Sequence, residues 1–188
     1  MTKPVLQVVI ASTRPNRMGG TVAEWFVAEA EKHGGFEVQV TDLKELDLPM
    51  MNEPKHPAMQ DYQFEYTKKW AKIVENSDAF VFVMPEYNFG YNAALKNAID
   101  YLYKEWAYKP VSFVSYGGVS GGLRAVQMLK QVVTTLKMIP LTEQVTIPFV
   151  FEYIKDGKLQ PTEIVTQSVD VMLNELAKVE KATASLRG

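Results

Sequence analysis

Pro85, Glu86, Tyr87 and Asn88 stand together at a position where a ligand could bind. They follow the apolar run Ala79–Met84, which is typical of a strand buried on both faces, and they precede Ala93–Leu102, whose spacing predicts an amphipathic helix. A corner between a strand and a helix lies at the carboxyl edge of a parallel sheet, where open α/β folds bind ligands. This corner therefore offers an acid, a phenol and an amide to a bound molecule.

Two further corners of the same kind carry polar residues. Ser12–Gly20 follows the apolar strand Val5–Ile10, and Ser115–Gly122 follows another short apolar run. In the first corner, Arg14 and Arg17 stand ahead of a glycine-rich helix start, where free backbone N–H groups favour an anion such as phosphate. A plain glycine turn with solvated arginines is the alternative. Neither the P-loop nor the three-glycine dinucleotide spacing is present. Three such corners at one sheet edge indicate a cofactor site.

The third corner contains patterns found in other enzyme classes. Gly118–Gly122 matches the nucleophile elbow of serine hydrolases, whose mechanism needs a histidine base, usually after the serine. The only two histidines, His33 and His56, both precede Ser120, which argues against a hydrolase. A Walker spacing of glycines is also present, but the lysine and the hydroxyl residue that should follow it are missing. Glycines without these partners indicate a backbone that approaches a flat ring closely.

Composition excludes several classes of function. The chain has 188 residues, a formal net charge of −2 and no cysteine. Positive and negative residues are mixed along the chain, so the sequence does not indicate a basic surface that would bind nucleic acid or an anionic membrane. Without cysteine there is no thiolate chemistry, so redox chemistry would belong to a cofactor. No metal-ligand spacing, secretion signal or membrane-length apolar run is visible. We expect a cytoplasmic protein with a single domain over residues 1–188.

Five strands alternate with five helices along the chain. The predicted strands are Val5–Ile10, Phe36–Thr41, Ala79–Met84, Val111–Val114 and Gln144–Ile147. The predicted helices are Thr21–Lys32, with a capping box at Thr21–Glu24, Gln60–Asn76, Leu95–Tyr103, Leu123–Leu136 and Pro161–Lys181. Leu46–Pro57 is predicted to be an irregular active-site loop, and Asp156-Gly157 predicts a tight hairpin. This alternation predicts an α/β fold in which helices cover both faces of a parallel sheet.

Taken in order, these features resemble the NAD(P)H-dependent FMN reductase family. The marks are Ser12-x-Arg14, Pro85–Asn88, Leu95–Asp100 and Ser115–Gly118, and the resemblance covers about residues 5–147. Any single mark is weak, whereas all four in this order and at these spacings are specific. The resemblance implies a three-layer flavodoxin-like fold with a five-stranded sheet of order 2-1-3-4-5. It also implies non-covalent FMN and a homodimer or homotetramer whose flavin sites lie near the subunit interface.

The resemblance also implies roles for individual residues. The FMN phosphate would be held by Ser12, Arg14 and Arg17, with loop amides around Met18 and Gly19. One edge of the isoalloxazine would be lined by Pro85, Glu86, Tyr87 and Asn88, and the other would be approached by Ser115, Tyr116, Gly117 and Gly118. Glu86 could be a general base, although a hydrogen-bonded carboxylate near the polar edge of the ring is the preferred interpretation.

Three positions depart from or vary within the family pattern. Ala11 stands where glycine is usual, and Asn92 stands where many members have proline. Arg17 occupies a position that varies between arginine and small polar residues.

The implied activity is an oxidoreductase without an essential catalytic side chain. Hydride would pass from NADPH or NADH to FMN, and electrons would then pass to a small acceptor such as a flavin, a quinone or an azo compound. Amides at Gly117 and Gly118 are predicted to face the negative charge of the reduced ring. A flavodoxin-type electron carrier is one alternative, which the near-neutral charge disfavours. A non-catalytic flavin-binding redox sensor is the other, and the sequence leaves it open.

Overall fold

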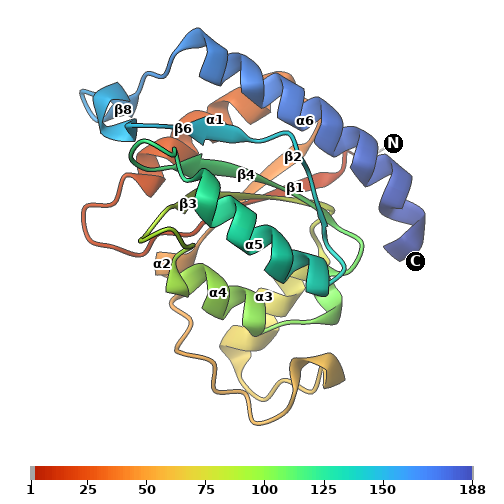
Figure 1. Cartoon of the computed structure of the whole chain (residues 1–188). Coiled ribbons are helices and arrows are strands. Elements are labelled where there is room, and N and C mark those ends of the chain that lie inside the picture. Colours follow the sequence, from red (N-terminus) through yellow and green to blue (C-terminus); the bar gives the residue numbers. More distant parts are fainter. Residues whose placement is uncertain (1–2, 188) are drawn as a thin grey trace.

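A computed structural model describes residues 3–187. A parallel sheet lies between two layers of helices (Figure 1). Its strands are β1 (Val5–Ile10), β2 (Glu37–Asp42), β3 (Ala79–Pro85), β4 (Pro110–Tyr116), β5 (Ile139–Pro140) and β6 (Val145–Ile147). The strand order is β2-β1-β3-β4-β5, with β6 also paired to β4. The predicted order and the predicted α/β class are therefore confirmed.

Helices cover both faces of the sheet, as predicted. One face carries α1 (Gly19–His33) and α6 (Glu163–Thr183). The other carries α3 (Glu65–Glu75), α4 (Ala93–Asp100) and α5 (Leu123–Thr135), and α2 (Leu43–Leu46) follows β2. Short 3-10 turns cover Pro57–Met59, Lys104–Trp106, Val150–Tyr153 and Ala184–Arg187, and the predicted hairpin pairs β7 (Ile154–Lys155) with β8 (Lys158–Leu159).

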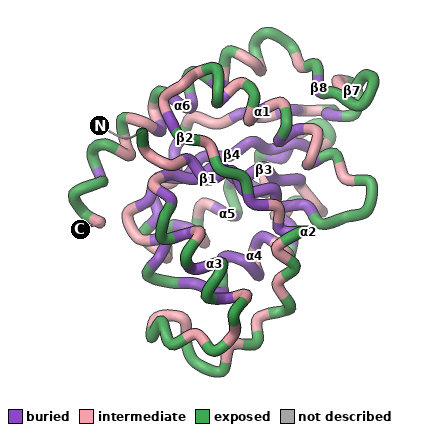
Figure 2. The backbone as a smooth tube through the Cα atoms, turned by 180° about the vertical axis from the view of Figure 1, so that it is seen from behind, coloured by how far each residue is buried: buried purple, intermediate pink, exposed green. Residues whose placement is uncertain are grey.

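The alternation of side chains along each strand divides the core in two. In β4, Val114 and Tyr116 pack in the cluster that lies under α1 and α6, whereas Val111 and Phe113 pack under α4 and α5. Every residue of β3 is buried, which explains its uninterrupted apolar sequence. Figure 2 shows these buried strands between helices whose outer surfaces are exposed.

The fifth strand is interrupted, which the sequence did not predict. The predicted strand Gln144–Ile147 corresponds to β6, and the shorter β5 precedes it on the same side of β4. Between them, the Ser112 hydroxyl donates to the Glu143 carbonyl oxygen at 2.6 Å. Pro140 has no N–H to offer a sheet, which is tolerated because β5 lies at the edge.

Four predicted helix starts are wrong by two to five residues, including that of α6, which begins at Glu163 and not at Pro161. The capping box at Thr21 is wrong, because α1 begins at Gly19 after Met18, whose side chain makes no capping hydrogen bond. Helix α3 begins at Glu65, not Gln60, since Gln60 has a left-handed φ of 54°. The Glu53 carboxylate then accepts from the free N–H groups of Gln63 and Phe64 just before α3. Helix α4 begins at Ala93, two residues before its predicted start.

The loop over residues 46–57 is tied to α4. The Asn97 amide donates to the Pro49 carbonyl oxygen at 2.7 Å and accepts from the Met51 N–H at 2.9 Å. The Tyr101 hydroxyl also donates to the Pro49 oxygen, at 3.0 Å. These bonds fix an irregular segment that has no regular hydrogen-bonding pattern of its own.

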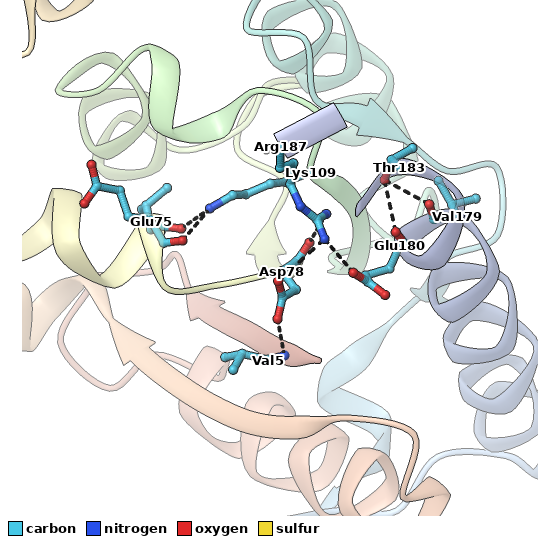
Figure 3. A network of polar contacts seen from close by, with 9 residues as sticks. Val5, Glu75, Asp78, Lys109, Val179, Glu180, Thr183 and Arg187 are labelled. Carbon is cyan, nitrogen blue, oxygen red and sulfur yellow. Dashed lines mark hydrogen bonds and ion pairs between the residues drawn. The ribbon is translucent and has the colours of Figure 1, made fainter. Parts of the chain in front are cut away.

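The end of the chain closes over the amino edge of the sheet. Arg187 forms ion pairs with Asp78 and Glu180 and donates to the Asp78 carbonyl oxygen at 3.0 Å, while Asp78 accepts from the Val5 N–H at 2.8 Å (Figure 3). Both ends of the described chain therefore meet at the start of β3, opposite the edge that carries the three corner loops. No helix within residues 3–187 is both long and apolar enough to cross a membrane.

Candidate functional site

Three loops leave the carboxyl edge of the sheet together (Figure 1). The first loop (residues 11–18) joins β1 to α1, the second loop (86–92) joins β3 to α4, and the third loop (117–122) leads from β4 to α5. Because β1, β3 and β4 are adjacent and parallel, their following loops must lie side by side. The sequence prediction that three polar corners share one edge is correct.

A cavity of about 140 Å³ lies at the first loop and is called here the first-loop cavity. It is lined by Ser12, Arg14, Asn16, Arg17, Met18, Pro85, Tyr87 and Tyr116. It is smaller than the roughly 300–1,000 Å³ of pockets that enclose a whole small molecule, so it suits a head group. It adjoins the start of α1, where the first N–H groups of the helix have no partner within the helix. The charge and the donors favour an anion.

Arg17 supports the shape of this cavity. Its guanidinium donates to the Ser12 carbonyl oxygen at 2.8 Å and forms an ion pair with Asp42 at the end of β2. Its side chain is only 14% exposed. Arg14 is exposed, and its guanidinium carbon lies 5.7 Å from the centre of the Tyr87 ring. One arginine therefore holds the loop in place while the other is available to a ligand.

The first and second loops are joined by two hydrogen bonds. The hydroxyls of Ser12 and Tyr87 lie 3.0 Å apart, and the Asn92 amide donates to the Ala11 carbonyl oxygen at 2.7 Å. Ser12 and Asn92 are both buried. The second loop also turns on itself through paired hydrogen bonds between Tyr87 and Gly90, which leaves Asn88 exposed at its tip with a φ of 49°.

Glu86 joins the second loop to the third. Its carboxylate accepts from the Ser120 hydroxyl at 2.8 Å and from the Arg124 N–H at 3.2 Å, and it forms an ion pair with the Arg124 guanidinium. Burial raises the pKa of Glu86, but the hydrogen bonds from Arg124 and Ser120 outweigh it and hold the pKa below its usual range. Glu86 is therefore an ionised, fully engaged carboxylate, and its position does not suit a general base.

Ser120 has no histidine partner. Its hydroxyl donates to Glu86, whereas the His33 ring contacts Asn174 and the His56 ring accepts from the Ala58 N–H. The elbow-like glycine pattern consequently lacks the base of a serine hydrolase within the described chain.

The third loop brings backbone close to the site. Gly122 has a φ of 88°, and a Cβ there would lie 2.8 Å from the Ser115 Cβ, so only glycine fits. By contrast, a Cβ on Gly118 would meet no atom within 4 Å. Gly118 therefore faces open space beside the second loop, where the resemblance places the ring edge.

Sequence reasoning missed three residues that shape the site. Asp42 pairs with Arg17, Asn92 holds the first loop, and Arg124 pairs with Glu86 and stacks on Phe89 with its guanidinium carbon 3.8 Å from the ring centre. Their partners lie 25 to 81 residues away in the chain. The spacing of apolar residues within one helix or strand does not predict contacts between residues so far apart.

Residues 5–152 match the family described as NADPH-dependent FMN reductase. The chain belongs to this family. The NAD(P)H-dependent FMN reductase of Schizosaccharomyces pombe is 42% identical over 149 residues, which cover 77% of this chain and 74% of that protein. The NADPH azoreductase of Bacillus sp. is 27% identical over 157 residues, 82% of each chain. Among solved structures, the flavoenzyme NAD(P)H:(acceptor) oxidoreductase of Paracoccus denitrificans superposes with a TM-score of 0.77 at 21% identity, covering 96% of this chain and 98% of that one.

As a member of the NADPH-dependent FMN reductase family, the chain is an NAD(P)H oxidoreductase that works with FMN, and its fold is flavodoxin-like. The residues of the site fit this cofactor. The Tyr116 hydroxyl is buried in the first-loop cavity without a hydrogen-bond partner among residues 3–187, and Gly118 leaves open space at the third loop. An FMN reductase needs both an anion-binding cavity and access for a flat ring.

Proposed function

We propose that the first-loop cavity holds the phosphate of FMN and that the isoalloxazine ring lies between the second and third loops. The observation that carries this proposal is the convergence of donors on one small cavity. Ser12, Arg14 and Met18 line it, and the free N–H groups at the start of α1 follow directly after Met18. Backbone N–H groups and arginine are the donors that phosphate oxygens prefer.

The second loop supplies one side of the proposed ring site. Pro85 ends β3, and the Glu86 side chain is held by Ser120 and Arg124. Tyr87 is held by Ser12, which leaves Asn88 free at the turn. The other side is supplied by Ser115 near the end of β4 and by Gly117 and Gly118 of the third loop. This arrangement gives the ring polar groups at its edges and an accessible face.

Bound FMN supplies the redox chemistry, since it accepts hydride from NAD(P)H and passes electrons to a second substrate. The chain orients the reactants and offers polar groups. The amides of Gly117 and Gly118 are proposed to donate where negative charge develops. Because the carboxylate of Glu86 is engaged by Arg124 and Ser120, no proton transfer is assigned to it.

The electron acceptor is a small molecule. Relatives are named as an azoreductase and as quinone oxidoreductases, including one of Solanum tuberosum that is 33% identical over 101 residues. An open flavin face suits planar acceptors of these classes. We therefore propose that the chain reduces quinones, azo compounds or free flavin, with NADPH or NADH as the donor.

We also propose that the protein works as a homodimer or homotetramer. Large apolar side chains are exposed around the second and third loops and the segment after β6, namely Phe89, Val119, Leu123, Met128, Phe149 and Phe151. Such a grouping beside a ligand site supports burial against a second subunit. We further propose that residues 1–188 are one domain, because α6 packs on α1 and on β4, and that the protein works in the cytoplasm with its NAD(P)H supply.

An absorbance experiment tests the proposed function. The purified protein is incubated with FMN, desalted and mixed with NADPH without oxygen. Retained flavin bands that bleach promptly are expected, followed by recovery of the bands on addition of a benzoquinone. Retained flavin that does not bleach would contradict the enzyme and favour an electron carrier or a redox sensor. Loss of all flavin on desalting would contradict the assignment of the three loops.

A further inference from the structure

Tyr116 is placed differently from the role that the family resemblance implies. It is the last residue of β4, and the alternation of that strand directs its side chain to the face covered by α1. Its side chain lines the first-loop cavity together with Ser12 and Arg14. Because Ser115 and Tyr116 are neighbours in a strand, they point to opposite faces of the sheet. Only the backbone of Tyr116 continues towards the proposed ring site.

The Tyr116 hydroxyl is a buried donor without a partner. Tyr116 is 5% exposed, and its hydroxyl has no hydrogen-bond partner among residues 3–187. The nearby hydroxyls of Ser12 and Tyr87 are engaged with one another. A buried polar group without a partner is costly, and such groups in native proteins are commonly satisfied by a ligand or a water. The hydroxyl is therefore available to a molecule that enters the cavity.

The start of α1 leaves room for this hydroxyl. A Cβ on Gly19, the first residue of α1, would lie 2.7 Å from the Tyr116 hydroxyl oxygen, which is closer than real Cβ contacts. At Gly20, the next residue, a Cβ would meet no atom within 4 Å. A side chain at Gly19 would therefore force the phenol to shift, whereas one at Gly20 would not. The hydroxyl and the free N–H groups of the helix start are brought to the same place.

The chemistry of the cavity selects an oxyanion. Burial raises the pKa of the Tyr116 hydroxyl and the adjacent Tyr87 raises it further, whereas Ser12 and the two arginines act in the opposite direction. The phenol consequently remains protonated at neutral pH and can donate. Arginine and backbone N–H groups are donors as well. Because the phenol, the arginine and the backbone N–H groups are all donors, a ligand that pairs with them must carry several acceptor oxygens.

We propose that the Tyr116 hydroxyl donates a hydrogen bond to a phosphate oxygen of FMN, and that Tyr116 thereby selects FMN over riboflavin. This inference rests on the proposed function, because it takes the first-loop cavity as the phosphate site. It moves Tyr116 from the edge of the ring to the opposite end of the cofactor. Gly19 has a positioning role, since it admits the phenol.

The test measures the affinity of flavin-free protein for FMN and for riboflavin by quenching of flavin fluorescence. In Tyr116→Phe, FMN affinity is expected to fall about 10- to 100-fold, as for a lost hydrogen bond to a charged group, with riboflavin affinity changed less than about twofold. Riboflavin lacks the phosphate, so it does not report on this hydrogen bond. The flavin-free variant is expected to unfold at the same or a higher temperature, because the substitution removes an unpaired buried group.

A glycine pair gives a second, independent variant. Gly19→Ala is expected to displace the phenol and to lower FMN affinity more than riboflavin affinity, whereas Gly20→Ala, one residue along α1, leaves both affinities unchanged. Equal losses for both flavins in Tyr116→Phe would show that the hydroxyl serves the ring, and no loss for either would show that it is not used; each result overturns the inference. Wild-type protein that binds neither flavin would instead overturn the proposed function itself.

Discussion

The Asn92 amide donates to the Ala11 carbonyl oxygen at 2.7 Å, so the two positions that depart from the family pattern are in direct contact. Asn92 is the residue before α4, and its backbone φ of −75° is one that proline also adopts. Where a proline would fix this helix start through its ring, asparagine holds it through a hydrogen bond to the first loop. Asn92 therefore joins the second loop to the first through the backbone of residue 11.

Replacement of Asn92 by alanine is expected to loosen both loops. The change removes the only side-chain donor recorded for the Ala11 oxygen in the described chain, at a buried position, and we expect the free energy of unfolding to fall by about 1–2 kcal/mol. Urea unfolding of the flavin-free protein measures this. Thr13→Ala, an exposed change in the same loop, serves as the control and should leave the midpoint unchanged. An unchanged midpoint in Asn92→Ala would contradict this role.

The two arginines of the first loop are expected to separate stability from binding. Arg17 is held by Ser12 and Asp42, so Arg17→Gln should lower the free energy of unfolding by about 1–3 kcal/mol as well as FMN affinity. Arg14 is exposed and makes no ion pair recorded for residues 3–187, so Arg14→Gln should lower FMN affinity alone. The loss of FMN affinity in Arg14→Gln should be smaller at high salt, because salt screens exposed charges. Equal destabilisation by both substitutions would disprove the division of roles.

The open space at Gly118 allows a steric test of the ring site. Because a Cβ there meets no atom within 4 Å, Gly118→Leu should leave thermal unfolding of the flavin-free protein nearly unchanged. If the isoalloxazine occupies that space, affinity for both FMN and riboflavin should fall at least about tenfold. Val119→Leu, at a neighbouring residue that is 73% exposed, is the matched control. Full flavin binding by Gly118→Leu would exclude the ring from this position.

The sheet and the common edge of the three loops could be predicted because local sequence determines them. The run Ala79–Met84 is buried on both faces, and its apolar pattern therefore reports the strand directly. The helix starts at α1 and α3 could not be predicted in the same way. At both places distant segments come together, since Gly19 lies against Tyr116 and the Glu53 carboxylate accepts from the N–H groups just before α3.

The side-chain partners within the site were also beyond the sequence pattern. Glu86 and Arg124 lie 38 residues apart and meet only because β3 and β4 are adjacent in the sheet. One signal was available and not used: the alternation along β4 puts Tyr116 on the same face as Val114, towards α1 and away from Ser115. This alternation alone indicates that the Tyr116 side chain points away from the proposed edge of the ring.

The ion pair of Glu86 predicts a pH dependence in the acid range. Its pKa is lowered in the folded protein, so its stabilising contribution is fully present above the unfolded pKa of about 4.5 and is lost as pH falls through the folded value. Glu86→Gln should cost about 1–3 kcal/mol at pH 7, where its side chain is 7% exposed beside Arg124. Urea unfolding at several pH values should show the difference shrinking below about pH 4.5. A difference that is constant from pH 7 to pH 3 would contradict this interpretation.

Lys109 predicts a pH dependence of the opposite sign at the other edge of the sheet. Its buried ammonium donates to the carbonyl oxygens of Val74 and Glu75 at the end of α3, near Arg187 and Asp78 (Figure 3). Burial, reinforced by the charge of Arg187 and partly offset by Asp78 and Glu75, lowers the pKa of Lys109 to about 8. Folding therefore disfavours the charged form of this side chain.

The contribution of Lys109 to the free energy of unfolding therefore rises with pH between its pKa in the folded protein and its pKa in the unfolded chain. From pH 8 to about 10.5 the unfolded chain binds the additional proton, so the contribution of Lys109 to the free energy of unfolding increases, by roughly 2 kcal/mol between pH 7.5 and 9.5. Lys109→Met removes the titrating group while it keeps the apolar stem. The difference in free energy of unfolding between the wild type and this variant should therefore grow in favour of the wild type over that range. A difference that stays constant would show that the ammonium titrates normally, and that its hydrogen bonds to the end of α3 compensate fully for its burial.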